Sequence, residues 1–186
     1  MSKKYILLGV LLLFAVPTWA QEDVEKVNVF VGYSYLRGDF GRLHGDVVGG
    51  GVVSGAYNFN KHFAAVGEWS THHDSDVKGM NVDNNLFLGG PRFTFLRTKR
   101  LTAFSQALFG FHHTQIGLPG TGLQGDDDTG FAFAGGVGFD VNLSKHWAIR
   151  TQVDYVTLDL DLPSVGINQS TDNMRTSGGI VFRWGG

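Results

Sequence analysis

The sequence predicts an all-β chain that folds into an eight-stranded antiparallel up-and-down transmembrane β-barrel. Residues 148–155 alternate strictly between polar and apolar side chains, which indicates a strand with two unlike faces. Segments of this kind recur along the chain, and each is close to the roughly 9–11 residues of a tilted membrane-spanning strand. Charged side chains within these segments keep to one face, so the opposite face can meet lipid.

The N-terminus predicts that the protein is exported. Residues 1–20 have the form of a signal peptide, in which Lys3 and Lys4 precede an apolar run and small residues up to Ala20 form the cleavage site. The apolar run is shorter than the roughly 20 residues of a membrane-spanning helix. Residues 21–26 form a short lead and residues 27–186 the barrel domain. Because the chain has no cysteine, the exported domain needs a full core or a closed hydrogen-bonded sheet.

The strand segments are predicted at residues 27–36, 50–59, 63–72, 85–95, 101–113, 131–142, 147–158 and 173–184. Short turns join them at 60–62, 96–100 and 143–146, and the turn sequence at 58–63 is repeated in part at 142–147. Long polar connections rich in Gly, Asp and Asn occupy 37–49, 73–84, 114–130 and 159–172. Short turns on the periplasmic side and long loops outside are typical of outer-membrane barrels.

One face of every strand segment carries no charge and is rich in aromatic and branched residues. In chain order this face reads Val27, Val29, Val31, Tyr33 and Tyr35; Val53, Tyr57 and Phe59; Phe63, Ala65 and Trp69; Phe87, Phe93 and Phe95; Phe109 and Phe111; Phe131, Phe133, Val137 and Phe139; Ile149, Val153 and Tyr155; Ile180, Phe182 and Trp184. An Arg or Lys on a lipid-facing wall would cost roughly 2–4 kcal/mol at the bilayer midplane. The absence of charge therefore predicts that this face contacts lipid.

The charged residues of the strands are predicted to point into the lumen. They are Glu68, Arg92, Asp140, Arg150, Asp154, Arg175 and Arg183, whereas the lysines that follow the signal peptide lie in the lead, turns or loops. A secreted lipocalin-like barrel is the soluble alternative. It would need Lys and Glu scattered over its water-facing side, and the charge-bearing face here has no lysine.

Aromatic residues near the strand ends predict two interfacial girdles, because aromatic rings favour the headgroup region. The periplasmic girdle would hold Phe59, Phe63, Phe95, Trp147, Phe182 and Trp184, and the outer girdle Tyr35, Trp69, Phe111, Phe131 and Tyr155.

Several motifs resemble the small outer-membrane β-barrel family grouped with the OmpA and OmpX transmembrane domains and with porin-family proteins. They are residues 29–35, Gly90-Pro91-Arg92-Phe93, Asp154-Tyr155 and the last strand. The resemblance implies a salt-bridged lumen that plugs the barrel. It also implies that Ser177, Gly179, Phe182 and Trp184 form the C-terminal signal that the barrel-assembly machinery recognises, although Gly185 and Gly186 follow the last aromatic residue here.

Several other short motifs could have a chemical function, and each also has a simpler structural interpretation. His72-His73-Asp74 and His112-His113 are interpreted as solvated rim residues rather than a metal site, and no metal or cofactor is predicted. His73-Asp74-Ser75 is compared with barrel hydrolases that trim lipid A, but no partnering acid is evident on the outward face. Asp126-Asp127-Asp128 is read as a solvated loop rather than a divalent-cation site. Gly49-Gly50-Gly51 lacks the Lys-Ser/Thr and helix of a phosphate loop.

The sequence thus predicts a non-enzymatic protein of the outer membrane with an envelope-structural or surface-interaction role. A narrow channel and a lipid A-modifying enzyme are the alternatives. Expected partners are outer-membrane lipid and lipopolysaccharide, the assembly machinery, and an extracellular ligand of the loops. The formal net charge of −2 gives no electrostatic case for nucleic acid.

Overall fold

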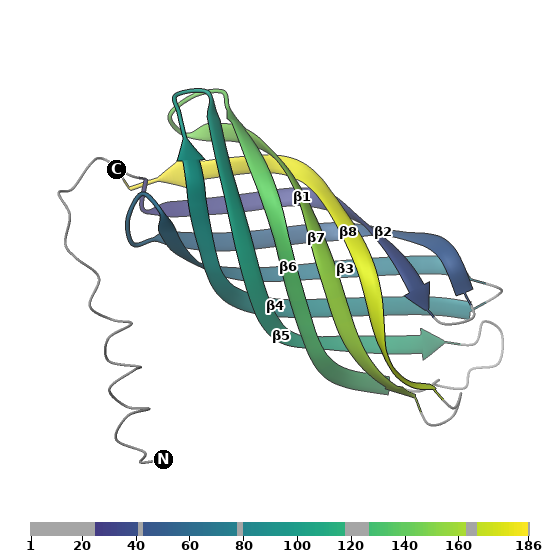
Figure 1. The fold of residues 1–186 in the computed structure, drawn as a ribbon. Coiled ribbons are helices and arrows are strands. Elements are labelled where there is room, and N and C mark those ends of the chain that lie inside the picture. Colours follow the sequence, from purple (N-terminus) through teal and green to yellow (C-terminus); the bar gives the residue numbers. More distant parts are fainter. Residues whose placement is uncertain (1–24, 41–42, 78–79, 118–126, 163–166, 186) are drawn as a thin grey trace, which may run out of the picture.

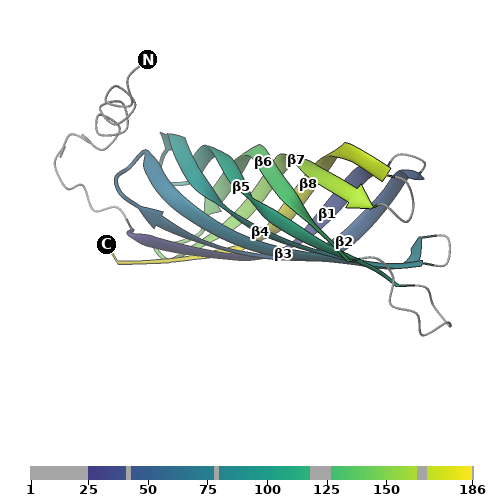
Figure 2. The ribbon, with the colours of Figure 1, turned by 90° about the horizontal axis from the view of Figure 1, so that it is seen from below.

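The computed structural model describes residues 25–40, 43–77, 80–117, 127–162 and 167–185, and they form one closed antiparallel barrel (Figure 1, Figure 2). Each strand pairs with its neighbours in sequence, and β1 pairs with β8 to close the sheet. The strands are β1 Val27–Phe40, β2 Leu43–Asn58, β3 Phe63–Val77, β4 Met80–Arg97, β5 Leu101–Gly117, β6 Asp127–Asn142, β7 Trp147–Leu162 and β8 Ile167–Trp184. This architecture confirms the predicted fold class. The predicted signal peptide lies outside the described residues.

The strands are longer than predicted at one end of the barrel. Residues assigned to long loops continue the ladder, so that Arg37 pairs with Val47, and β7 and β8 stay paired as far as Leu162 and Ile167. The predicted extent of the connections at 37–49, 73–84, 114–130 and 159–172 is therefore wrong. Polar composition indicated contact with water, and paired strands beyond a membrane have that contact without becoming irregular.

The opposite end carries the tight turns and both ends of the barrel domain (Figure 1). In the β2–β3 turn the Asn60 side chain accepts hydrogen bonds from the backbone N–H groups of His62 and Phe63, at 2.8 and 2.9 Å. Ser144 does the same in the β6–β7 turn for His146 and Trp147, at 3.3 and 3.1 Å. The repeated turn sequence thus forms the same capped turn twice, because a short oxygen-bearing side chain can replace a backbone acceptor.

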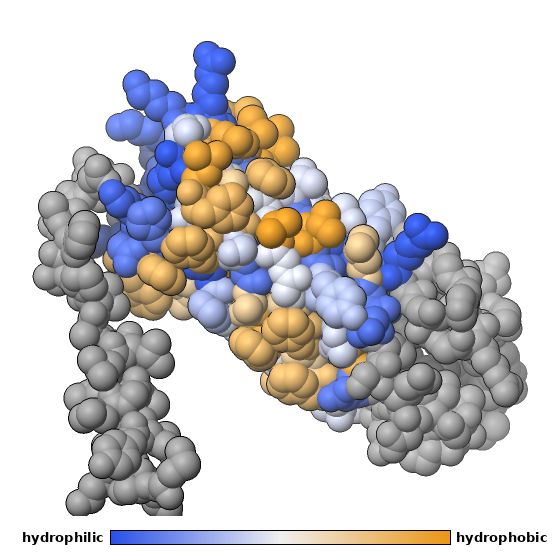
Figure 3. Space-filling view, viewed as in Figure 1, coloured by the Kyte–Doolittle hydropathy of each residue, from blue (hydrophilic) through white to orange (hydrophobic). Residues whose placement is uncertain are grey.

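Burial alternates along most of the described length of the strands and separates lumen from wall, with an exception on β5, where Thr102, Ala103 and Phe104 are all buried. Asp154 is 0 % exposed and Tyr155 is 49 % exposed. A band of exposed hydrophobic side chains lies on the outer wall, and Figure 3 shows part of it on one face of the barrel. No helix among the described residues is long and apolar enough to cross a membrane.

The seam between β1 and β8 depends on glycine. Gly32 and Gly179 are partners in the ladder, and a Cβ on Gly179 would collide with the carbonyl oxygen of Val31 and with Gly32. The two strands that close the barrel can approach only because these positions carry no side chain.

Candidate functional site

Arg175 on β8 is the centre of the charged lumen. Its Nη2 donates to Glu68 of β3 at 2.5 Å and to Asp154 of β7 at 2.9 Å, while Nη1 donates to Ser70 at 3.1 Å. Arg175, Glu68 and Asp154 have side chains that are 0 % exposed. Since β3 and β8 are not neighbours in the sheet, this ion pair crosses the interior rather than running along the wall.

Asp154 links Arg175 to a second arginine through an amide. Gln106 donates to Asp154 at 3.1 Å and accepts from Arg92 Nη2 at 2.8 Å and Nε at 3.2 Å. Gln152 also donates to Asp154, at 3.2 Å. Both glutamines were absent from the predicted set, which counted only ionised residues, although each lies on the inward face of its strand.

Asp140 on β6 organises the charges nearer the tight-turn end. Arg150 holds it with two parallel hydrogen bonds, Nε to Oδ1 at 2.7 Å and Nη2 to Oδ2 at 2.9 Å. Arg183 donates to Oδ2 at 2.7 Å and to Asn142 at 2.8 Å. Two-point contacts of this kind are among the stronger ionic hydrogen bonds.

Phe104 joins the two charged groups. The guanidinium of Arg92 lies 4.2 Å and that of Arg150 lies 4.6 Å from the centre of its buried ring, and Arg150 also lies 5.2 Å from the ring of Phe30. A ring face attracts cations, so Phe104 lets two arginines share the lumen. Sequence reasoning missed Phe30 and Phe104, since strand aromatics were assigned to lipid.

Two glycines on β6 make room for this network. A Cβ on Gly136 would collide with the Asp154 carboxylate and with the Val153 carbonyl oxygen, and one on Gly138 would collide with the Phe104 ring. The network therefore depends on the absence of side chains on β6 as well as on the charged residues themselves.

An apolar layer lies in the lumen beyond the charges, toward the long-strand end. Its buried members include Leu36, Leu86, Leu108, Val156 and Leu158. Val156 and Leu158 follow Asp154 along β7, so they lie farther from the tight turns. The described side chains of the lumen thus include an apolar layer as well as the charged one, whereas the sequence predicted only the charged one.

Each histidine pair has one residue in the lumen and one on the outer wall. The interpretation as solvated residues is therefore wrong for His72 and His112. His72 is buried and contacts Ser34 at 2.7 Å, and His112 is buried between Thr114 and the Asp159 carbonyl. His73 is exposed and the half-buried His113 contacts Thr129 at 2.9 Å. Adjacent residues of one strand point to opposite faces, and these strands continue past the predicted rim.

No group of three or more His, Cys, Asp or Glu side chains within the described ranges could hold a metal ion. Asp126 lies outside those ranges, as do the side chains of Asp74, Ser75, Asp127 and Asp128.

The outer wall carries every residue of the two predicted girdles. Tyr35, Trp69, Phe111, Phe131 and Tyr155 are exposed toward the long-strand end, and so are Phe59, Phe63, Phe95, Trp147, Phe182 and Trp184 toward the tight turns. Trp69, Phe87 and Phe111 stack across adjacent strands, with ring centres 6.4 and 5.5 Å apart. Of the predicted assembly signal, Phe182 and Trp184 lie on this wall, Gly179 lies in the β1–β8 seam and Ser177 is buried in the lumen.

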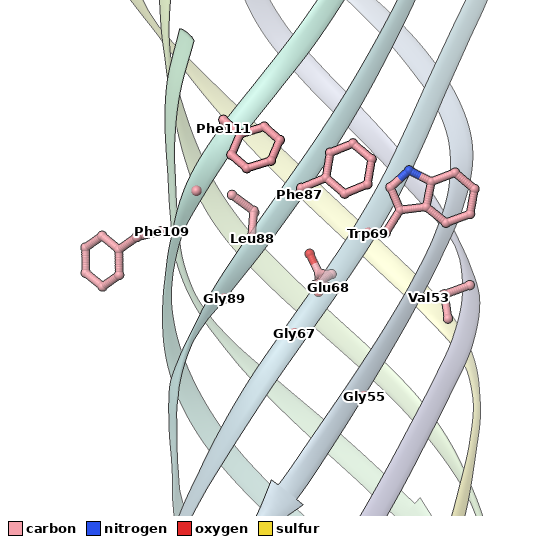
Figure 4. A pocket seen from close by; sticks show the side chains of 11 residues that line it. Val53, Gly55, Gly67, Glu68, Trp69, Phe87, Leu88, Gly89, Phe109 and Phe111 are labelled. Atoms are coloured by element: carbon pink, nitrogen blue, oxygen red, sulfur yellow. The ribbon is translucent and has the colours of Figure 1, made fainter. Parts of the chain in front are cut away.

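A shallow hollow of about 550 Å³ lies on the same wall (Figure 4). Gly55, Gly67 and Gly89 are ladder partners at its base, and the Trp69–Phe87–Phe111 stack lies along one side. Glu68 also contributes to the lining, but its carboxylate is engaged by Arg175 in the lumen. The hollow is therefore an apolar feature of the wall rather than a polar reaction site.

A closed antiparallel barrel with a charged interior and an apolar aromatic exterior defines an integral outer-membrane β-barrel, because only closed barrels and helices satisfy the backbone in lipid. A family model described as an outer membrane protein beta-barrel domain matches residues 6–181. The chain belongs to this family and is a protein of the outer membrane. The family consists mostly of non-enzymatic barrels.

Solved structures share the fold at low sequence identity. Neisserial surface protein A is 10% identical with a TM-score of 0.67, covering 88% of this chain and 100% of that one. Ail, the attachment invasion locus protein of Yersinia pestis, is 15% identical with a TM-score of 0.58, covering 87% and 100%. OprG of Pseudomonas aeruginosa is 12% identical with a TM-score of 0.54, covering 88% and 97%. No curated protein sequence matches the chain.

Proposed function

We propose that this protein is a surface-interaction barrel whose plugged lumen anchors a platform of paired strands outside the cell. Barrels of this class keep their chain ends and short turns in the periplasm, so the long-strand end faces outward. The observation that carries the proposal is the continuation of the strands past the outer girdle. β1 runs on from Tyr35 to Phe40, and β3 from Trp69 to Val77.

The charge of this platform favours a neutral or cationic ligand. By sequence, the extended strand ends hold one arginine, Arg37, against ten aspartates, which are Asp39, Asp46, Asp74, Asp76, Asp83, Asp127, Asp128, Asp159, Asp161 and Asp172. The names of two structural neighbours refer to attachment and invasion and to the cell surface, and Ail has been solved with a heparin analogue. A sulfated polyanion would be repelled by the acidic ends here. We therefore propose a surface-interaction role with a neutral or cationic ligand.

Shortening the platform tests the role. Because Arg37 pairs with Val47, and Leu158 with Thr171, two-residue turns can replace residues 38–46 and 159–170 without breaking the ladder below. Cells that display the intact protein should adhere to cationic or neutral surfaces, and cells with the shortened barrel should not. Equal adhesion by equally abundant, heat-modifiable barrels would contradict the proposal.

The proposal also treats the lumen as closed and the protein as non-enzymatic. The two-layer filling of the lumen supports this over the narrow channel, and planar-bilayer recordings should show no discrete openings. Openings that disappear on altering Arg92 or Glu68 would establish the channel instead. Lipid A from expressing cells should have an unchanged mass spectrum, and a shifted acyl pattern would establish the lipid A-modifying enzyme.

A further inference from the structure

The tight-turn end of the barrel carries a ring of basic side chains at every junction between strands. The β2–β3 turn carries Lys61, the β4–β5 turn carries Lys99 and Arg100, the β6–β7 turn carries Lys145, and Lys26 lies where β8 meets β1. All five side chains are exposed. We propose that this basic collar binds the anionic phospholipid headgroups of the leaflet that surrounds it.

The turns of the collar contribute basic residues and no acidic ones. Residues 59–62, 98–100 and 143–146 contain no Asp or Glu. Glu25, at the same end, pairs with Arg97 at 3.3 Å, and Asp140 is engaged by Arg150 and Arg183 inside the lumen. By sequence, residues 22–26 and these three turns hold five basic and three acidic residues, and one of the acids, Glu25, is paired with Arg97. The tight-turn end therefore keeps a net positive charge.

The position of the collar fits headgroups rather than hydrocarbon. Phe59 and Phe63 flank Lys61 closely in sequence, Trp147 lies two residues after Lys145, and all three aromatic side chains are exposed on the wall. Aromatic residues of this kind mark the edge of the hydrocarbon. Figure 3 shows hydrophilic side chains gathered at the tight-turn end, next to the hydrophobic band.

The turns that present the basic residues are held in place by the barrel. His62 stacks on Phe93 with ring centres 5.9 Å apart and contacts the Thr94 carbonyl at 2.9 Å. In the equivalent turn, His146 stacks on Phe182 at 6.4 Å. Each stack anchors the residue next to a collar lysine, so the lysine projects from an ordered backbone.

The basic residues lie around the whole end of the lipid-contacting wall. This distribution matches the lipids that surround the barrel better than a compact partner that would bind one side. Phosphate groups attract Lys and Arg through charge, by a factor of up to about 5 per residue near an anionic surface. The long-strand end is rich in Asp instead, so the preference should be confined to one leaflet.

The test compares spin-labelled phosphatidylglycerol with spin-labelled phosphatidylcholine in phosphatidylcholine bilayers that contain the refolded barrel. Electron paramagnetic resonance gives the fraction of each lipid immobilised on the wall. The wild-type barrel should prefer phosphatidylglycerol by about two- to fivefold, and K61Q/K99Q/R100Q/K145Q should lower that ratio to about one. The matched control K61R/K99R/R100K/K145R keeps the charge at the same positions and should keep the preference.

Heat-modifiable gel migration verifies that each variant is folded before the measurement. An unchanged preference in the neutral variant would overturn the proposal, and so would equal losses in the neutral variant and the control. Binding to purified cell-wall sacculi is measured in parallel. A variant that loses sacculus binding but keeps its lipid preference would identify the wall as the partner and would also overturn the proposal.

Discussion

Removing the Arg175 guanidinium while keeping its bulk, as in Arg175→Met, should destabilise the barrel by about 3–5 kcal/mol, the cost of breaking a buried ion pair from one side. The size of the loss depends on which hydrogen-bond donors each carboxylate keeps after the substitution. Glu68 would lose the donor that lies 2.5 Å away, whereas Asp154 would keep Gln106 and Gln152 as donors. The main cost is therefore an unpaired Glu68 carboxylate in a lumen without exposed surface.

Arg183→Met is the matched comparison, because it removes an arginine from the other charged group. Asp140 would keep both hydrogen bonds from Arg150, so the loss should be closer to the roughly 1.5–3 kcal/mol of a hydrogen bond to a charged group. Adding Glu68→Gln to Arg175→Met removes the stranded charge and should recover a large part of the stability.

Urea unfolding in lipid bilayers, followed by fluorescence of the wall tryptophans and by gel mobility, measures these differences. Equal losses for the two arginine variants would refute the reasoning. So would a loss below about 1 kcal/mol for Arg175→Met, or a double variant no more stable than the single one, because each requires that Glu68 gains little from Arg175.

Three further predictions follow from the packing and the charge. Gly136→Ala should cost about 1–3 kcal/mol in the same unfolding assay, since its Cβ would meet both the Val153 carbonyl oxygen and the Asp154 carboxylate. Gly55→Ala faces open space and should cost nothing, and equal effects would contradict the close packing of β6 against β7. Single barrels in planar bilayers should not conduct, and reproducible openings would show that the two lumen layers leave a path. Whole cells displaying the protein should not bind immobilised heparin, and binding that survives shortening of residues 38–46 and 159–170 would point to another surface of the cell.

Strand parity was enough to assign the charged strand residues to the lumen and the girdle aromatics to the wall, because alternation is a local property of the backbone. It identified Arg175 and Glu68 as inward residues. It could not pair them, because β3 and β8 are not neighbours and their contact across the interior depends on the stagger of the whole barrel.

The residues that sequence reasoning missed were inward ones without charge. Phe30 and Phe104 share the inward face with the arginines they contact, but aromatic residues in a membrane barrel are expected at lipid. His72 lies on the same inward face as Glu68, and it is buried because β3 continues past it to Val77. Strand length was the weakest inference, since polar residues outside a membrane can form either loops or paired strands.

The central claim is that the uncharged face of the strands meets lipid and the charged face fills a sealed lumen. Because the chain has no cysteine, single cysteines can be placed and spin-labelled one by one at residues 149–156 of β7. Collision with oxygen, which concentrates in lipid, should be high at Ile149, Thr151, Val153 and Tyr155 and low at the residues between them. High collision with a water-soluble nickel chelate at those same positions, or no alternation, would contradict the claim.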